Sequence, residues 1–311
     1  MTKTAKRSIS WKETARRVWS EIQDDDVFGR AAQLSYYFLL ALFPLLMFLT
    51  SMIGLLLGSG TGLRHSLFDY LSKVLPSSAF QLVDSTIYEV TAASGGGKIA
   101  FGILAALWAA SAGMGAITDA LNVAYDVTET RPWWRRRLVA VGLTIALSVV
   151  VISALVMVLY GGRIADYIAL NYSGGSALAM AWKILVWPIV LGFMLLAFAL
   201  IYYFAPDVRK QKWAWITPGS VVGVAVWLLV SFAFRLYLHF FDSYSKTYGS
   251  LGAVIVLMLW LYFTGAAILI GGEVNSEVEN MEAKAGAPDA KEKGEKAPNE
   301  GPKSKSARSA A

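Results

Sequence analysis

The chain of 311 residues is 56% hydrophobic and only 16% charged, and its mean hydropathy is +0.51. A soluble domain usually carries about 25% charged residues, so a soluble protein of this composition would expose far too much apolar surface. Cysteine is absent, which excludes disulfides, thiolate metal sites and cysteine nucleophiles. The composition therefore predicts an integral membrane protein, whose net charge of +6 its topology has to explain.

Residues 1–30 form a predicted cytoplasmic segment that contains a short amphipathic helix. Within it, Trp11, Val18, Trp19 and Ile22 recur at helical spacing, and basic residues lie off that face. A helix of this kind next to a membrane span lies in the headgroup region of the bilayer. We expect it to anchor the chain on the membrane surface before the first span.

Residues 31–272 form a predicted membrane domain. About 20 apolar residues in a helix span a hydrocarbon core of about 30 Å, and in lipid every backbone polar group must be satisfied within its own segment. We therefore predict an all-α, polytopic membrane protein with six transmembrane helices. They lie at about residues 31–57, 99–121, 138–160, 184–204, 216–240 and 251–270.

The stretch between the first two predicted spans has helical patterns of its own. Apolar residues recur at helical spacing over residues 63–74 and 80–90, on either side of a break at 76–78. We expect an extracytoplasmic helical hairpin that caps the bundle, with a lid over a cavity as the functional alternative. At the other end of the chain, residues 273–311 form a predicted cytoplasmic tail. Its polar, low-complexity composition predicts disorder from about residue 282.

Basic residues fall in alternating blocks along the chain. Seven precede the first span, four lie in the second loop between spans, three in the fourth loop and seven in the tail, which accounts for 21 of the 28. Because basic residues beside spans stay cytoplasmic, both termini are predicted in the cytoplasm. The positive charge then faces anionic membrane lipids rather than nucleic acid, so lipids are the expected partners.

Polar residues gather near the cytoplasmic ends of the first, second and sixth predicted spans. Asp119, Asn122 and Asp126 fall at helical offsets that share one face, and Arg30 is a natural partner for Glu273 or Asp119. The sequence predicts either a polar cluster at the inner mouth of the bundle or interfacial residues that meet water. The candidates are Arg30, Gln33, Tyr37, Asp119, Asn122, Asp126, Glu273 and Asn275.

Two further residues stand out within the spans. Pro44 lies midway along the first span, removes a helical hydrogen bond and predicts a kink. Arg235 is the deepest unambiguous charge and lies near the outer end of the fifth span. It either snorkels to the surface and pairs with Asp242 or attracts anions at the outer mouth of a pathway.

The sequence contains no recognisable motif for binding a metal ion or a cofactor. The chain has two histidines, no HExxH motif and no P-loop. We therefore expect no metal, no cofactor and no enzyme. Small residues four apart, Gly54 with Gly58 and Gly219 with Gly223, are typical of close helix contacts, and these faces offer a route to a homo-oligomer.

The chain resembles the YihY/BrkB family of bacterial inner-membrane proteins over about residues 15–280. The resemblance rests on the segment 24–44, which begins Asp-Asp-Asp and ends in Pro44, on residues 119–125, and on the closing segments 248–253 and 272–275. It implies six spans in the bacterial cytoplasmic membrane but no defined activity. Members of the family have been labelled ribonuclease, serum-resistance factor and transporter.

Three functions remain from the sequence, of which an intramembrane enzyme is the least favoured. The leading one is a permease or flippase for an amphipathic or anionic solute, such as a lipid or envelope precursor. The alternative is a non-transporting scaffold that maintains envelope integrity. We do not expect ribonuclease activity, because the sequence shows no set of carboxylates, histidines or metal ligands placed for phosphodiester chemistry.

Overall fold

The computed structural model describes residues 11–57, 69, 72, 96–171, 175–208, 215–240 and 243–284. These residues form helices and connecting turns without a strand, so the predicted all-α class is confirmed for the described part of the chain. The predicted hairpin, at residues 58–95, lies outside the described residues except for positions 69 and 72. The helices are α1 (Trp11–Asp24), α2 (Val27–Leu57), α5 (Gly96–Ala124), α6 (Trp133–Asn171), α7 (Gly175–Phe204), α8 (Pro218–Phe240) and α9 (Ser243–Lys284).

Five stretches within these helices are long and apolar enough to cross a membrane, and they correspond to the second to sixth predicted spans. They are Gly102–Ala124, Trp133–Gly162, Ala177–Phe204, Pro218–Tyr237 and Val254–Glu282. The first predicted span falls on α2, a helix of 31 residues that continues on both sides of Pro44. Except for α8, the observed helices extend beyond the predicted spans, because a polar turn of helix costs little outside a bilayer and the prediction followed hydropathy alone.

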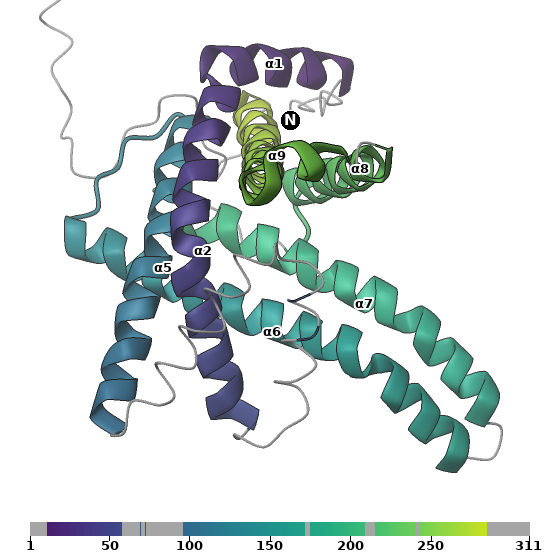
Figure 1. The fold of residues 1–311 in the computed structure, drawn as a ribbon. Helices are drawn as coiled ribbons and strands as arrows, with labels where there is room; N and C mark the ends of the chain where they lie inside the picture. The colour runs from purple at the N-terminus through teal and green to yellow at the C-terminus, as the bar shows by residue number, and fades with distance from the viewer. Residues whose placement is uncertain are drawn as a thin grey trace, which may run out of the picture.

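Consecutive helices pack in pairs, α2 with α5, α6 with α7, and α8 with α9. In Figure 1 the α6–α7 pair runs obliquely away from α2 and α5, and α1 lies across one end of the bundle. Hydrogen bonds join the end of α5 to the end of α7, the start of α8 to α9, and α1 to the last turn of α9. We call this region, where α2, α6 and α8 begin and α5 and α7 end, the α1 end.

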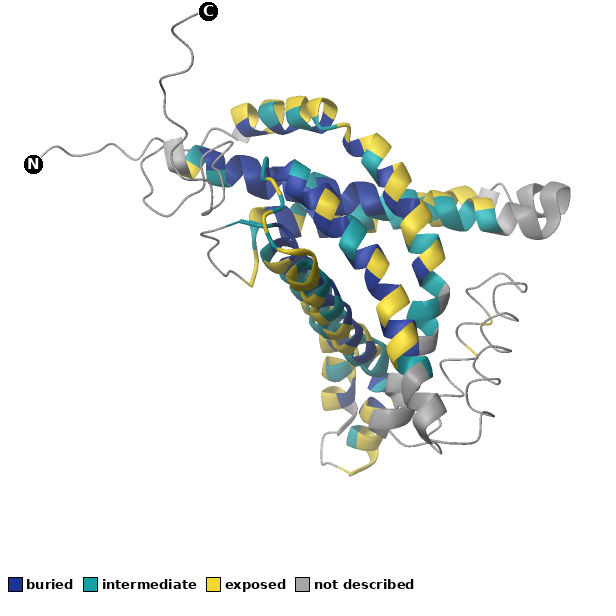
Figure 2. Cartoon of the chain, turned by 90° about the vertical axis from the view of Figure 1, so that its left-hand side faces the viewer, coloured by how far each residue is buried: buried dark blue, intermediate teal, exposed yellow. Residues whose placement is uncertain are grey.

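Helix α9 is the core of the molecule. It packs against α8, α2, α1 and α5, and residues 265–278 are buried on all sides except for the half-buried Ile270 (Figure 2). A helix that is buried all round requires partners on every face. The predicted boundary at residue 272 therefore does not coincide with a helix end, because α9 continues as a buried helix beyond it.

The outer faces of α6 and α7 are apolar and exposed. The exposed apolar side chains there include Val149 and Val158 of α6 and Ile184, Trp187 and Leu191 of α7. A soluble monomer rarely exposes so continuous an apolar surface. These faces are suited to lipid, which agrees with the membrane class predicted from composition.

Helices α8 and α9 cross closely through glycines. A Cβ atom on Gly271 would lie 2.6 Å from the carbonyl oxygen of Gly219 and would overlap the hydroxyl of Tyr202. A Cβ on Gly223 would lie 2.7 Å from the same hydroxyl, which donates a hydrogen bond of 2.9 Å to the carbonyl of Ile268. The Gly219–Gly223 pair is thus used within one chain, whereas the sequence suggested it as a face for a second copy. Residue 58 of the other glycine pair lies outside the described residues.

Helix α1 forms where predicted, but part of its apolar face packs on protein. Val18 and Ile22 are buried, and Arg17 reaches Glu277 of α9 at 3.4 Å. Trp19, which was predicted on the same face, is 59% exposed. The difference arises because α9 extends far enough to offer α1 a protein partner, which hydropathy alone did not show.

Candidate functional site at the α1 end

A cavity of about 220 Å³ lies at the α1 end between α2, α5 and α6. Arg30 and Tyr37 of α2 line it, Asp119 of α5 faces them, and Arg136 and Arg137 come from the first turns of α6. Among its lining residues the cavity has three arginines and one carboxylate. The remaining lining residues are Gln33, Leu34, Ala112, Gly115, Ala116 and Ala120.

The arginines of the cavity are held in different ways. Arg136 pairs with Asp119 across the cavity, and both side chains retain contact with solvent. Arg137 lies over the ring of Trp108, with its guanidinium carbon 4.0 Å from the ring centre. It also donates to the carbonyl of Trp108, but its buried Nε has no hydrogen-bond partner in the described part of the chain. An unpaired buried donor on a cation is costly, so an anionic acceptor in the cavity would bind favourably.

Exposed apolar side chains continue from this cavity along α2 and α5. Leu40 lies one turn beyond Tyr37 on α2, and it is 55% exposed. Trp108 and Leu104 lie one and two turns beyond Ala112 on the same face of α5, and both are exposed. The surface is therefore cationic at the α1 end and apolar further along the same two helices.

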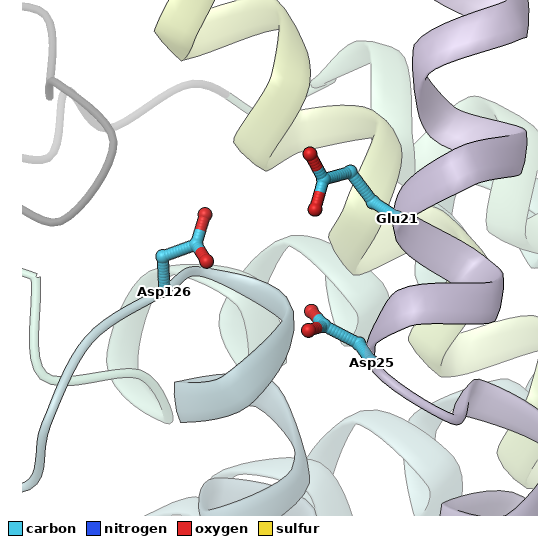
Figure 3. Close-up of side chains that lie close together, drawn as sticks. All are labelled: Glu21, Asp25 and Asp126. Carbon is cyan, nitrogen blue, oxygen red and sulfur yellow. The ribbon is translucent and has the colours of Figure 1, made fainter.

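Next to the cavity, carboxylates from three segments of the chain converge. Oxygen atoms of Glu21 on α1, Asp25 in the α1–α2 turn and Asp126 after α5 all lie within 4.8 Å of one another (Figure 3). Glu273 of α9, which is 1% exposed, reaches Asp25, and the charges of Glu21 and Asp126 act on it as well. We call these four residues the carboxylate cluster. Of the four, the sequence singled out only Asp126 and Glu273, and its expectation of no metal site stays a prediction.

Tight backbone turns aim these carboxylates inward. Asp126 has a φ of 51° and ends α5 in a Schellman-type turn, in which its N–H donates to Val123 and the N–H of Val127 donates to Asn122. Glycine usually takes this left-handed position, so aspartate here costs conformational energy. Asp26, with a φ of 49°, begins α2 and accepts from the N–H of Gly29.

Close packing brings Glu273 to the same place. A Cβ on the preceding residue, Gly272, would lie 2.6 Å from Cδ2 of Leu121, so the leucine side chain would have to shift to admit it. Glycine thus lets α9 pass close to the end of α5. The negative charges of the four carboxylates are therefore close together. Burial, together with the nearby carboxylates of Asp126 and Glu21, raises the pKa of Asp25 above its ordinary value.

Arg30 connects the carboxylate cluster to the cavity. Its Nε donates a hydrogen bond of 2.8 Å to the carbonyl of Asp25, while its side chain lines the cavity. The sequence paired Arg30 with Glu273 or Asp119, and the structure shows no direct ion pair of this kind among the described residues. Its guanidinium acts on the charge of Asp25 instead.

Asn122 belongs to a separate polar network. Its Nδ2 donates to Glu129 at 2.9 Å and its Oδ1 accepts from the N–H of Asp207 at 2.8 Å. Arg131 donates to both oxygens of Glu129, at 2.7 and 2.8 Å, and to the carbonyl of Ala205 at 2.8 Å. This network joins the α5–α6 turn to the end of α7. Helical offsets placed Asn122 with Asp119 and Asp126, but the three lie in three different places. Asn122 belongs to this network, Asp119 lines the cavity and Asp126 lies in the carboxylate cluster.

The stabilising effect of Glu129 should disappear in acid. Burial alone would raise its pKa, but hydrogen bonds from Arg131 and Asn122 hold the pKa below the ordinary value of 4.5. The native state therefore favours the ionised form, so its contribution is complete above about pH 4.5 and is lost as the pH falls through the lower native pKa. In thermal unfolding of the detergent-solubilised protein, Glu129→Gln should lower Tm at pH 7, and the difference from the wild type should shrink progressively as the pH falls below about 4.5. Glu282→Gln, at an exposed position, should leave Tm unchanged across the same pH range.

Asn275 caps the start of α8. Its Oδ1 accepts from the N–H of Gly219 at 2.7 Å, and its Nδ2 donates to Oγ1 of Thr217 at 3.0 Å. Thr217 and Ser220 exchange hydrogen bonds around Pro218 in a reciprocal cap. Through these two hydrogen bonds Asn275 joins α9 to α8.

Arg235 lies apart from these groups. It is exposed on α8, and sixteen residues of helix at about 1.5 Å each place it about 24 Å from Gly219 along the axis. This agrees with its predicted position toward the opposite end of the bundle. The side chains of His239 and Asp242 lie outside the described residues.

Several residues of the site were not identified from the sequence. They are Glu21, Asp25, Glu129, Arg131, Arg136, Arg137 and Asp207. The arginines had been interpreted only as topology signals, and Asp25 was one of three adjacent aspartates with no pattern to separate them. A Glu-Thr-Arg order in the α5–α6 turn was the one local signal for the Glu129–Arg131 pair.

Comparison with known proteins places the chain in a family. The profile of the family described as virulence factor BrkB matches residues 18–297. The chain belongs to the BrkB family. Among BrkB relatives, a Bacillus subtilis (strain 168) protein named "Putative ribonuclease-like protein YfkH" is 37% identical over 249 residues, covering 80% of this chain and 88% of the relative. No solved structure matches the chain.

Other BrkB relatives carry the name UPF0761 membrane protein. One from Stenotrophomonas maltophilia (strain R551-3) is 28% identical over 281 residues, covering 88% of this chain but 61% of the relative. Another from Aeromonas salmonicida (strain A449) is 27% identical over 267 residues, covering 84% of this chain and 87% of the relative. The membrane class predicted from composition agrees with these names.

Proposed function

We propose that this BrkB protein is a permease or flippase for an anionic amphipathic solute, such as a lipid or envelope precursor, in the bacterial inner membrane. In this proposal α2 supplies the first of six spans, and the α1 end faces the cytoplasm with both termini. Arginines of α1, of the start of α2 and of the α5–α6 turn all lie at that end, where the positive-inside rule would place them.

The cationic cavity carries the proposal. Arg30, Arg136 and Arg137 outnumber the single carboxylate of Asp119 among its lining residues, so it has a formal charge of +2. Arginine is suited to phosphate because its fixed fork of donors matches the oxygen geometry. A cavity of about 220 Å³ has room for a headgroup but not for a whole lipid.

The apolar surface next to the cavity supports an amphipathic solute. The exposed side chains of Leu40, Leu104 and Trp108 continue along α2 and α5 from the cavity, so an acyl chain could lie against them while the headgroup meets the arginines. A free, fully polar anion would gain nothing from this surface. The substrate class is therefore an anionic lipid rather than a small soluble anion.

Lipid transfer between leaflets in proteoliposomes tests the proposal. Purified protein is reconstituted with a fluorescent phosphatidylglycerol or phosphatidylcholine probe, and movement is measured by chemical quenching of the outer leaflet. We expect faster transfer of the anionic probe. Arg136→Gln with Arg137→Gln should slow it about tenfold or more, because each lost charge-assisted hydrogen bond is worth about 1.5–3 kcal/mol.

Arg135→Gln is the matched control, since Arg135 is exposed in the same basic run and does not line the cavity. Gel filtration and insertion assays establish that each variant folds. If the anionic and neutral probes move at the same rate as in protein-free vesicles, or if Arg135→Gln slows transfer as much as the double variant, the proposal is wrong.

A scaffold remains the alternative, and one observation favours it. Asn122, Asn275 and Arg131 are fully engaged in joining helix ends, so part of the polar cluster serves the architecture. No transfer, together with an envelope defect when the protein is deleted, would support the scaffold. RNA hydrolysis by the same preparation would instead favour the activity in the name of the Bacillus relative.

A further inference from the structure

The carboxylate cluster gathers four acidic side chains that are far apart in the sequence. Glu21 and Asp25 come from α1 and the turn after it, Asp126 from the end of α5, and Glu273 from the centre of α9. Oxygens of the first three lie within 4.8 Å of one another. Three of them keep contact with solvent, whereas Glu273 is 1% exposed.

Glu273 is the observation that points to a ligand. Its Oε1 is buried and has no hydrogen-bond partner among the described residues, although buried polar atoms in proteins are nearly always paired. The side chain lies within hydrogen-bond reach of Asp25, and the charges of Glu21 and Asp126 act on it. Two carboxylates this close, one of them with a buried oxygen that no donor reaches, require a proton or a cation between them.

The cluster concentrates negative charge. Arg30 acts on the charge of Asp25, and its Nε donates to a backbone carbonyl. Ionised carboxylates held this close in a partly buried site repel one another and lose hydration, which costs several kcal/mol per ion. The cluster must therefore take up protons or a metal cation.

We propose that Glu21, Asp25 and Asp126 bind one hard divalent cation of the Mg²⁺ and Ca²⁺ class, with the buried carboxylate of Glu273 beside Asp25 adding to the charge that attracts it. Carboxylate oxygens are the ligands these ions prefer. Two oxygens bound at about 2.4 Å can lie up to about 4.8 Å apart, so the observed spacing is within the reach of one ion. The solvent contact of the three outer residues gives the ion an entry path and leaves positions for water.

The ion would tie together three elements of the α1 end. It would hold α1 and the α1–α2 turn against the end of α5 and against α9. This goes beyond the proposed lipid transfer and does not depend on it, because the site consists of different residues from those that bind the headgroup.

Cation binding to the full-length protein in detergent tests the proposal. Chelator-treated protein is titrated with Mn²⁺, and free Mn²⁺ is followed by its electron paramagnetic resonance signal, with Mg²⁺ and Ca²⁺ as competitors. We expect saturable binding near one ion per chain and a rise in Tm on addition of each ion. Glu273→Gln and Asp126→Asn should each weaken binding at least tenfold.

Asp24→Asn is the matched control, because Asp24 is adjacent in sequence but exposed and bound to Ser20. It should leave the affinity unchanged. The proposal is overturned if the wild-type protein binds no Mn²⁺ saturably up to about 10 mM, beyond the weakest protein sites for such ions. It is equally overturned if Asp24→Asn weakens binding as much as Glu273→Gln, or if both cluster variants fold and bind normally. A variant that fails to fold leaves the wild-type titration and the other variant to decide.

Discussion

Alanine at Gly219 or Gly271 should destabilise the protein more than any other single methyl group added to a described helix. The Cβ at Gly219 would overlap the carbonyl oxygen of Gly271 and lie 2.5 Å from Cγ of Asn275. Neither obstacle can move without separating α8 from α9 or breaking the cap on α8. Overpacking of this kind costs about 1–3 kcal/mol or more, and backbone contacts put these sites at the upper end.

Unfolding by sodium dodecyl sulfate in mixed micelles measures the effect. Gly142→Ala is the control, since a Cβ there meets nothing within 4 Å, and alanine in a helix interior should gain about 0.5–1 kcal/mol over glycine. The packing argument is contradicted if Gly219→Ala is as stable as the wild type. A loss at Gly142 equal to the loss at Gly219 would contradict it too.

The helices long and apolar enough to cross a membrane could be predicted because they depend on local composition. The five spans found in the described residues contain or overlap the predicted ones, since hydropathy over about 20 residues determines whether a segment enters lipid. Helix ends could not be predicted equally well. Glu273 was placed near the end of a span, yet α9 continues to Lys284 because α1 covers its polar residues.

The members of the site were harder to predict, because they meet only in three dimensions. Asp24, Asp25 and Asp26 are identical in sequence terms, but one is exposed, one faces the carboxylate cluster and one caps α2. Helical offsets put Asn122 and Asp126 on one face, but α5 ends at Ala124 and Asp126 lies in a left-handed turn. Periodicity describes a helix and fails where the helix stops, which is where these polar residues lie.

Arg131→Ala should destabilise the α1 end by about 2–4 kcal/mol, because removing one member of a mostly buried ion pair leaves the other uncompensated. Arg131 and Glu129 are 11% and 19% exposed, and the pair is bidentate. The same guanidinium donates to the carbonyls of Phe204 and Ala205 at the end of α7, so its loss also exposes acceptors that the helix leaves unpaired.

Two further variants separate charge from geometry. Arg131→Lys keeps the charge but loses the planar fork, so its stability should lie between those of Arg131→Ala and the wild type. Arg131→Ala combined with Glu129→Gln should cost less than the two single changes added together, because the stranded carboxylate is removed as well. Arg135→Ala, an exposed arginine of the same segment, should change the free energy of unfolding by no more than about 0.5 kcal/mol. If Arg131→Ala is equally mild, the network does not hold the α5–α6 turn to α7. In that case α6 alone would position Arg136 and Arg137, the cavity residues that follow this turn in the sequence.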